Sequence, residues 1–341
     1  MGMETKNPHT LTEAIKYFAD PTVALNYFVA IRWPKGVTCP HCGSQGVSYL
    51  AKQNRWQCHT KHAKRQFSAK VGTVFEDSPL SLEKWLVTMW VEVNAKNSIS
   101  SCELARALGV TQKSAWFMLH RVRFALKRGS FEKMGRNGVP VEADETFIGG
   151  RSEFMHKKER ARKIRGGGPN DKTVVMGLLE RHTSKKHSTV RAMVLPKHPN
   201  QYDIHEIIHK NVEPGAHLMT DEHAAYKRLY GEFEHQFVDH ASHYAEGIVH
   251  TNGLENFWAL FKRCIKGTHI SIEPFHLAAY LDSEAFRFNN RKANDSGRFL
   301  TAMPTVVGKR LTYKTLIGVT ESEGLKATDK GAGSADGQLP N

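Results

Sequence analysis

The chain lacks the long apolar runs and the paired cysteines of membrane and secreted proteins. No run approaches the roughly 18 consecutive apolar residues that a bilayer-spanning helix needs, and the N-terminus has no apolar signal-peptide core. The five cysteines are odd in number. Three of them lie close together, which favours a metal cluster over a disulfide framework. These absences predict a cytoplasmic protein that does not bind a membrane.

Acidic residues are too few to balance the basic ones. The sequence has 48 Lys and Arg against 34 Asp and Glu, which gives a formal net charge of +14. Such a surplus favours a polyanionic partner, with nucleic acid first and an anionic membrane a distant third. A basic soluble enzyme without such a partner is the remaining alternative.

The hydrophobic pattern predicts an α+β protein of several domains. A helical segment over 1–33 with one helix at 10–31 precedes a small β-ribbon over 34–76 and a helical region over 80–130. After Pro140 the pattern changes to strands and helices. The expected strands are 141–148, 173–180, 189–196, 216–221 and 233–240, and the expected helices are 203–211, 223–230, 251–265 and 273–290. The basic, glycine-rich segment 151–172 is expected to form a mobile loop, and its Lys157 and Lys158 to hold phosphates.

Cysteines and histidines of the ribbon form a candidate zinc site. In the CPHCG motif, Cys39 and Cys42 flank a tight turn, and Cys58 is followed by His59 and His62. A structural zinc ion takes four tetrahedral nitrogen or sulfur ligands, which Cys39, Cys42, Cys58 and His62 supply. His59 is the competing fourth ligand. Because so small a ribbon buries little apolar surface, one structural Zn²⁺ would contribute to its folding.

Residues 98–128 predict a helix-turn-helix with Gly109 in the turn. Its expected buried positions are Ile99, Leu104, Ala105, Leu108, Val110 and Ala115. The second helix would expose Gln112, Lys113, Arg121 and Arg123 and enter the major groove of DNA. A helical hairpin without a DNA role has similar spacing and stays an alternative.

Three carboxylates in the second half predict a metal-dependent site. Asp144 lies in the first strand, Asp221 ends the fourth, and Glu255 lies on the long helix. Neighbouring strands and a crossing helix can bring the three together. Hard oxygen ligands hold Mg²⁺ (or Mn²⁺), and two such ions activate the attacking oxygen and stabilise the leaving oxygen in phosphoryl transfer. Alone, Asp221 could equally cap the helix 223–230.

Neighbouring polar residues can assist the three carboxylates or compete with them. Lys262 shares a helix face with Glu255 and can contact phosphate there. Asn252, one turn before Glu255, is the rival third metal ligand. His250 can approach the site or only cap and pack. Glu145 should point to the face of the strand opposite Asp144.

Together these motifs resemble the DDE transposases of insertion sequences that carry an N-terminal zinc ribbon, the ISXO-like group. The resemblance spans about 20–292 and rests on CPHCG, QFSAKVGTVFEDSPL, VEADETFIGG, TDEHAAY, HTNGLENFWALFKR and FRFNNR. It implies a ribonuclease-H-like catalytic domain with a mixed sheet over 139–292. The extension over 293–341 follows, and its last 20 or so residues have the composition of a disordered tail. The resemblance also implies metal ligation by Asp144, Asp221 and Glu255 and a catalytic role for Lys262. The Cys58 and His62 half departs from a plain four-cysteine pattern.

The resemblance implies that the chain cuts and joins DNA in a bacterial cell, at the nucleoid. Hydrolysis at a transposon end would free a 3′-OH, which would then attack target DNA. The ribbon and helix-turn-helix would recognise terminal inverted repeats, and pairing of two ends would require a homo-oligomer. One alternative is a non-transposing nuclease on the same fold. The other is a zinc-ribbon DNA-binding regulator with an inactive catalytic domain.

Overall fold

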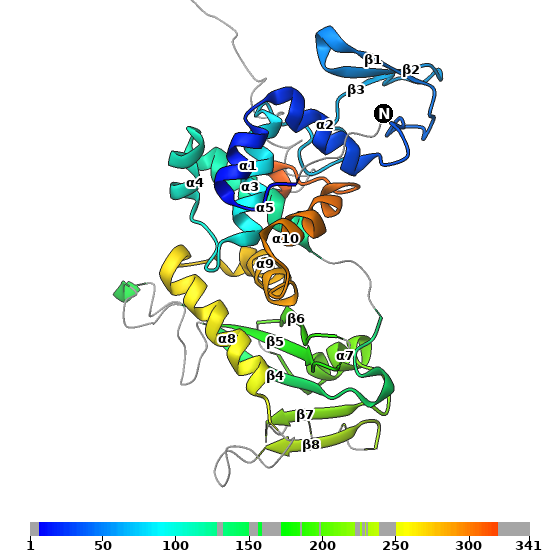
Figure 1. Cartoon of the computed structure of the whole chain (residues 1–341). Helices are drawn as coiled ribbons and strands as arrows, with labels where there is room; N and C mark the ends of the chain where they lie inside the picture. The colour runs from blue at the N-terminus through cyan, green and yellow to red at the C-terminus, as the bar shows by residue number, and fades with distance from the viewer. Residues whose placement is uncertain are drawn as a thin grey trace, which may run out of the picture.

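A helical unit with an attached β-ribbon lies beside a five-stranded mixed sheet in the computed structural model (Figure 1). The structure describes residues 7–127, 132–149, 156–158, 172–184, 186–197, 199–221, 226, 229, 231–238 and 250–319. Within those residues, no helix is long and apolar enough to cross a membrane. Most of the predicted loop 151–172, most of the predicted helix 223–230 and the C-terminal tail lie outside the described residues.

Two short helices begin the described chain, α1 (Leu11–Phe18) and α2 (Pro21–Arg32). The prediction of one helix over 10–31 is therefore wrong. Asp20 accepts hydrogen bonds from the backbone N–H groups of Thr22 and Val23, so its side chain caps a new helix. Pro21 favours the first position of that helix because it has no N–H to donate to the preceding turn.

The ribbon is a three-stranded antiparallel sheet of β1 (Val47–Leu50), β2 (Arg55–Cys58) and β3 (Gln66–Phe67). The short helix η1 (Ala51–Gln53) connects the first two strands. Trp33, which follows α2, packs against Trp56 and Phe67 with ring centroids 5.8 and 6.3 Å apart. This contact fastens the ribbon to the helical unit.

Three further helices continue that unit: α3 (Leu82–Asn94), α4 (Ser101–Leu108) and α5 (Gln112–Leu126). Gly109 ends α4 with φ +62°, a left-handed conformation that favours glycine. Leu104, Ala105, Ala115 and Leu119 form a small core between α4 and α5. The predicted pair of helices with a turn at Gly109 is therefore confirmed.

The segment after the sheet folds back onto the first helices. It contains α10 (Asp295–Ala302), η7 (Met303–Val306) and α11 (Tyr313–Leu316). The buried ring of Phe299 lies 5.8 Å from Phe18, 6.2 Å from Tyr27 and 5.1 Å from Trp90, measured between centroids. Residues from the two ends of the described chain thus share one apolar core.

The central sheet has the order β6-β5-β4-β7-β8. Its strands are β4 (Val141–Ile148), β5 (Thr173–Glu180), β6 (Thr189–Val194), β7 (His217–Asp221) and β8 (Glu234–Val238). The first three pair antiparallel, and β7 and β8 continue parallel to β4. All five predicted strands are therefore present, within two residues of most expected ends.

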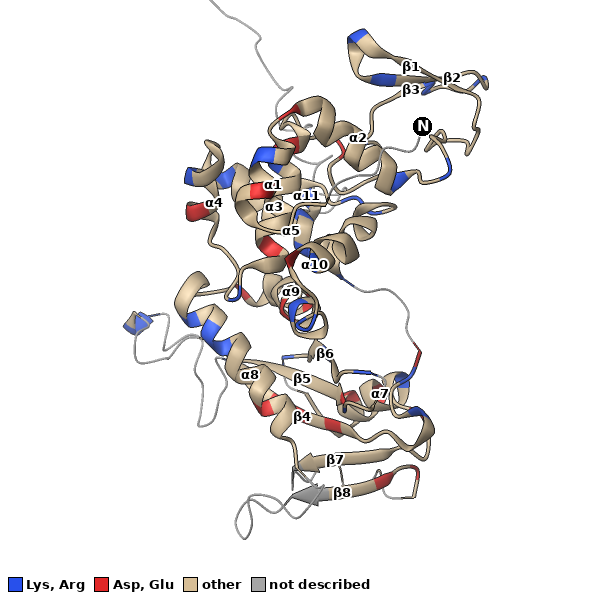
Figure 2. Cartoon of the chain, in the orientation of Figure 1, with Lys and Arg blue, Asp and Glu red and all other residues tan. Residues whose placement is uncertain are grey.

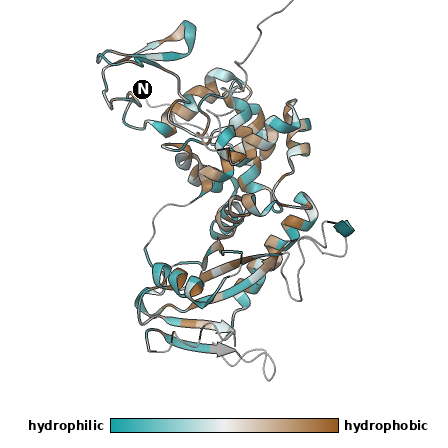
Figure 3. Cartoon of the chain, turned by 180° about the vertical axis from the view of Figure 1, so that it is seen from behind, coloured by the Kyte–Doolittle hydropathy of each residue, from teal (hydrophilic) through white to brown (hydrophobic). Residues whose placement is uncertain are grey.

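Helices cover both faces of this sheet. On one face lies α7 (Gln201–Asn211), and on the other α8 (Asn252–Cys264) with α9 (Leu277–Asn289). The remaining short elements are η2 (Arg136–Gly138), the π-helix η5 (Ile265–His269) and η6 (Pro274–His276). Figure 3 shows hydrophobic residues concentrated along β5 and inside the helical unit.

Candidate active site and zinc centre

The ribbon brings the four predicted zinc ligands together. The donor atoms of Cys39, Cys42, Cys58 and His62 all lie within 4.8 Å of one another. The Cys42 and Cys58 sulfurs are 3.7 Å apart, and the Cys39 sulfur lies 3.5 Å from His62 Nε2. Ligands of a tetrahedral zinc ion with Zn–S bonds of about 2.3 Å have about this spacing. The donor set therefore fits a structural zinc ion.

The competing histidine points elsewhere. His59 Nε2 lies 2.7 Å from the Ser48 hydroxyl on the neighbouring strand, and both side chains are exposed. Desolvation opposes ionisation of the Cys58 thiol, but hydrogen bonds from His62 and from the backbone of Thr60 outweigh it and lower its pKa to about 6. Cys58 is thus biased towards the thiolate, the form that binds metal.

On the central sheet, a hydrogen bond joins Asp144 of β4 to α8. Trp258 Nε1 donates to Asp144 Oδ2 over 2.9 Å, and the carboxylate is half-buried. Gly177 lies opposite Asp144 on β5, where an added Cβ would come within 2.6 Å of the Trp258 ring. The missing side chain at Gly177 is what lets the indole reach Asp144.

The other predicted residues of α8 flank this contact. Glu255 is exposed one turn before Trp258, and Lys262 is half-buried one turn after it. Side chains three and four residues apart lie on one side of a helix. Figure 2 shows an acidic residue near the start of α8 and basic residues towards its end. The helix therefore carries an acid and an amine on either side of the indole that meets Asp144 of β4.

Asp221 is the last residue of β7, which pairs in parallel with β4. The register pairs Met219 with Glu142. Asp221 comes two residues after Met219, just as Asp144 comes two residues after Glu142. The two predicted aspartates thus occupy equivalent backbone positions in adjacent strands; the side chain of Asp221 lies outside the described residues.

Glu142 is a functional neighbour that the sequence analysis missed. It is 1% exposed, and its carboxylate accepts the backbone N–H of Leu254 at 3.0 Å and Arg181 Nε at 2.8 Å. A carboxylate at a helix N-terminus stabilises the first turn. Gly253 makes room, because a Cβ there would lie 2.8 Å from Glu142 Oε2. Its position two residues before Asp144, on the same strand face, was the available signal.

The remaining three predicted residues differ in the contacts that they make. His250 contacts Arg181 Nη2 with its Nδ1 at 2.9 Å and its carbonyl at 2.6 Å, so it belongs to the cluster that fixes the start of α8. Asn252 is the exposed first residue of α8. Glu145 accepts a hydrogen bond from Tyr226 on the opposite side of β4, which confirms the face expected for it.

Only some of the predicted DNA-contacting residues are exposed. Gln112 and Lys113 lie exposed at the start of α5, and Lys157 and Lys158 are exposed as well. The prediction that Arg121 and Arg123 are exposed is wrong, since they are 6% and 1% accessible. Both point into the helical unit. Arg121 donates to the carbonyls of Glu76 and Leu311, and Arg123 pairs with Glu92.

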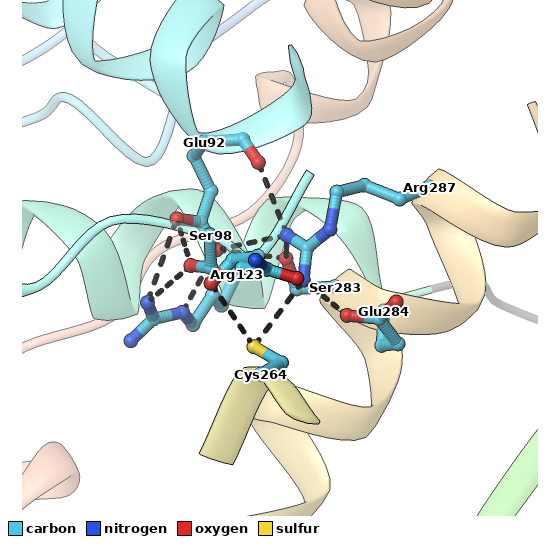
Figure 4. A network of polar contacts seen from close by, with 8 residues as sticks. Glu92, Ser98, Arg123, Cys264, Ser283, Glu284 and Arg287 are labelled. Atoms are coloured by element: carbon cyan, nitrogen blue, oxygen red, sulfur yellow. Dashed lines mark hydrogen bonds and ion pairs between the residues drawn. The ribbon is translucent and has the colours of Figure 1, made fainter. Parts of the chain in front are cut away.

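Glu92 is the centre of a buried polar network between the helical unit and the helices on the sheet (Figure 4). Its carboxylate accepts Arg123 Nε at 2.9 Å and the Ser283 hydroxyl at 2.7 Å, and its carbonyl accepts Arg287 Nη1 at 3.1 Å. Burial alone would raise the pKa of Glu92, but the two guanidinium groups hold it below its ordinary value. The network therefore joins α3 and α5 to α9 through one ionised carboxylate.

Glu92→Gln should destabilise the chain by about 3–5 kcal/mol, because it leaves buried arginine charge uncompensated. The matched control is Glu213→Gln, which breaks the exposed Glu213–Arg136 pair and should cost under about 1 kcal/mol. Urea unfolding followed by circular dichroism measures both. Equal losses of unfolding free energy in the two variants would show that burial of the Glu92 network adds nothing to stability.

Two family models match the chain. Residues 137–289 match the ISXO2-like transposase domain, and residues 21–60 match the transposase zinc-ribbon domain. An uncharacterised protein in the transposable element ISH50 of Halobacterium salinarum is 29% identical over 298 residues, which cover 82% of this chain and 96% of that protein. An uncharacterised transposase-like protein of Haemophilus influenzae is 35% identical over 85 residues, covering 25% of this chain and 68% of that protein.

Together with the mixed sheet and the ribbon, these matches define the chain as a transposase. It belongs to the ISXO2-like transposases that carry an N-terminal zinc ribbon. The family implies that the chain binds and cuts DNA, in line with its formal net charge of +14. A nuclease that does not transpose and an inactive regulator are not favoured.

Proposed function

We propose that this transposase cleaves transposon ends and transfers the freed strands into target DNA, with Mg²⁺ held by Asp144, Asp221 and Glu255. The observation that carries the proposal is the Trp258–Asp144 hydrogen bond, because it fastens the helix of Glu255 to the strand of Asp144. The equivalent strand positions of Asp144 and Asp221 add support. We also propose that residues 139–292 form a ribonuclease-H-like domain. The strand order β6-β5-β4-β7-β8 of the mixed sheet supports this proposal.

The donor set suits a hard divalent cation. Carboxylate oxygens are the ligands that Mg²⁺ prefers, and Mn²⁺ can replace it. When bound, two such ions would lower the pKa of the attacking water and neutralise charge on the leaving oxygen. The half-buried Asp144 and the exposed Glu255 leave the site open to a DNA backbone. Asn252 stays the rival of Glu255, because both lie on the first turn of α8.

The protein side chains would position and neutralise the reacting phosphate. Trp258 holds one oxygen of Asp144 in place, and Glu142 with Arg181 fixes the start of the helix that carries Glu255. Lys262, one turn beyond Trp258, would contact a phosphate oxygen. Such fixed placement of charge and ligands accounts for most of the rate in phosphoryl transfer.

DNA recognition would fall to the N-terminal part of the chain. The exposed Gln112 and Lys113 lie at the first turn of α5, the part of a helix-turn-helix that meets base edges. The zinc ribbon would contact the same transposon end, and Lys157 and Lys158 would bind phosphates. Since two ends must be paired, a homo-oligomer would assemble on DNA in the cytoplasm, at the nucleoid.

The test is strand transfer by the full chain. Duplexes that carry the inverted repeats flanking the gene, incubated with supercoiled plasmid and Mg²⁺, should give nicked ends and end–plasmid joints, and Ca²⁺ should give neither. Cleavage without joints would indicate a nuclease. Binding without cleavage would indicate a regulator, and either result would overturn the proposal.

A further inference from the structure

Basic side chains gather where α8 ends, in a segment we call the α8 tail (residues 259–270). Lys262, Arg263 and Lys266 surround a shallow hollow of about 470 Å³ that Ala259 and Gly267 complete. Neither Asp nor Glu occurs from residue 256 to residue 272. A basic surface without acidic neighbours fits a phosphate backbone.

Ile270 stands at the end of this tail with 84% of its surface exposed, the most of any large apolar side chain among the described residues. Its backbone has φ +63° and ψ −56°. The Ser271 N–H donates to the His269 carbonyl at 2.6 Å, so residues 269–271 form a γ-turn of the strained type. Glycine adopts this turn without strain, whereas a β-branched residue does not.

The turn beneath Ile270 is firmly held. The Ile270 N–H donates to the Ile265 carbonyl at 2.7 Å, and Cys264 Sγ donates to the Asn97 carbonyl at 3.3 Å. Ile265 and Ile272, on either side of it, pack into the core between α8, α9 and the sheet. An apolar side chain is thus exposed to water on a hydrogen-bonded turn beside a basic surface.

We propose that the α8 tail binds the transposon-end duplex beside the cleaved bond and that Ile270 inserts into a base step there. Proteins that bend duplex DNA use apolar wedges of this kind next to phosphate-binding side chains. The inference rests on the proposed function, because α8 also carries Glu255. The α-helix from Glu255 to Cys264 rises about 1.5 Å per residue, and the shorter π-helix η5 follows it, so Ile270 lies about 20 Å from Glu255, or about six base pairs from the cleaved phosphate.

The experiment measures base unstacking apart from cleavage. Full-length protein carrying Asp144→Asn binds end duplexes with 2-aminopurine at each of the six positions beside the cleavage site. One position should show a several-fold fluorescence rise on binding, as expected when a wedge partly unstacks a base step. Ile270→Ala should remove the rise and change the end-binding affinity less than about twofold. The control Ile15→Ala, on α1 and 48% exposed, should keep it.

Three further variants exclude a merely structural role. Ile270→Gly should also abolish the fluorescence rise. The melting temperature should stay the same or increase, because glycine removes the backbone strain of the γ-turn. Arg263→Ala and Lys266→Ala should each lower the magnitude of the slope of log K against log salt concentration by about 0.9, as one lost phosphate contact predicts.

The outcomes separate the two proposals. A fluorescence rise that survives in both Ile270 variants would overturn the wedge, even if cleavage and joining proceed as proposed. A fluorescence rise that depends on Ile270, together with a parent protein (Asp144 intact) that does not cleave transposon ends, would sink the proposed function and leave the wedge standing.

Discussion

Asp144→Asn should reduce Mg²⁺-dependent cleavage of a transposon end by at least about 10³-fold. Loss of one charged metal ligand removes several kcal/mol of transition-state stabilisation, and each 1.4 kcal/mol is about tenfold in rate. The fold should survive, because asparagine has nearly the same shape and its carbonyl can still accept from Trp258 Nε1. Rates come from gel assays on labelled duplexes, and a mobility shift checks end binding.

The matched control lies one residue away. Glu145→Gln removes the same charge from the opposite face of β4, where Tyr226 is the partner, and should keep cleavage within about tenfold. If both variants lose activity equally, net charge or stability explains the loss. If Asp144→Asn cleaves like the parent protein, the metal site lies elsewhere.

Removal of zinc should unfold the ribbon and lower the stability of the helical unit beside it. Binding of a structural zinc ion contributes about 10–16 kcal/mol to the folding free energy of small zinc domains. Cys39, Cys58 and Trp56 belong to one apolar cluster with residues of α2 and α3, so the loss should spread beyond the ribbon. A chelator should release one zinc ion per chain, detected with a colorimetric indicator, and lower the melting temperature.

The two histidines provide a paired control for that result. His62→Ala should lose the metal, whereas His59→Ala should retain it, because His59 contacts Ser48 and not the thiols. Zinc content by elemental analysis decides between them. One zinc ion per chain in the purified His62→Ala variant would show that His62 is not a ligand.

Local signals in the sequence predicted much of the fold. The spacing in CPHCG, the alternation in VEADETFI and Gly109 after an amphipathic helix each depend on neighbours within a few residues, and the structure has the expected elements there. The break at Asp20 and Pro21 was also local. It was missed because the apolar residues on both sides keep a roughly helical spacing.

Buried ion pairs could not be predicted in the same way. Arg123 reads as a surface residue because its partner Glu92 lies 31 positions away and on another helix. Glu142 was overlooked because its partners, Leu254 and Arg181, come from distant segments. The role of Asp221 remains a prediction. For all of these, tertiary structure decides whether a charge faces water or a partner.

The apolar core that α1, α2 and α3 share with α10 affects how the protein is made. Phe18, Tyr27 and Trp90 leave the ribosome long before Phe299, the residue that covers them. Between these segments lies the sheet with its catalytic candidates, so the helical unit cannot close until residue 299 has been synthesised. A chain that terminates before Phe299 would therefore lack a closed helical unit.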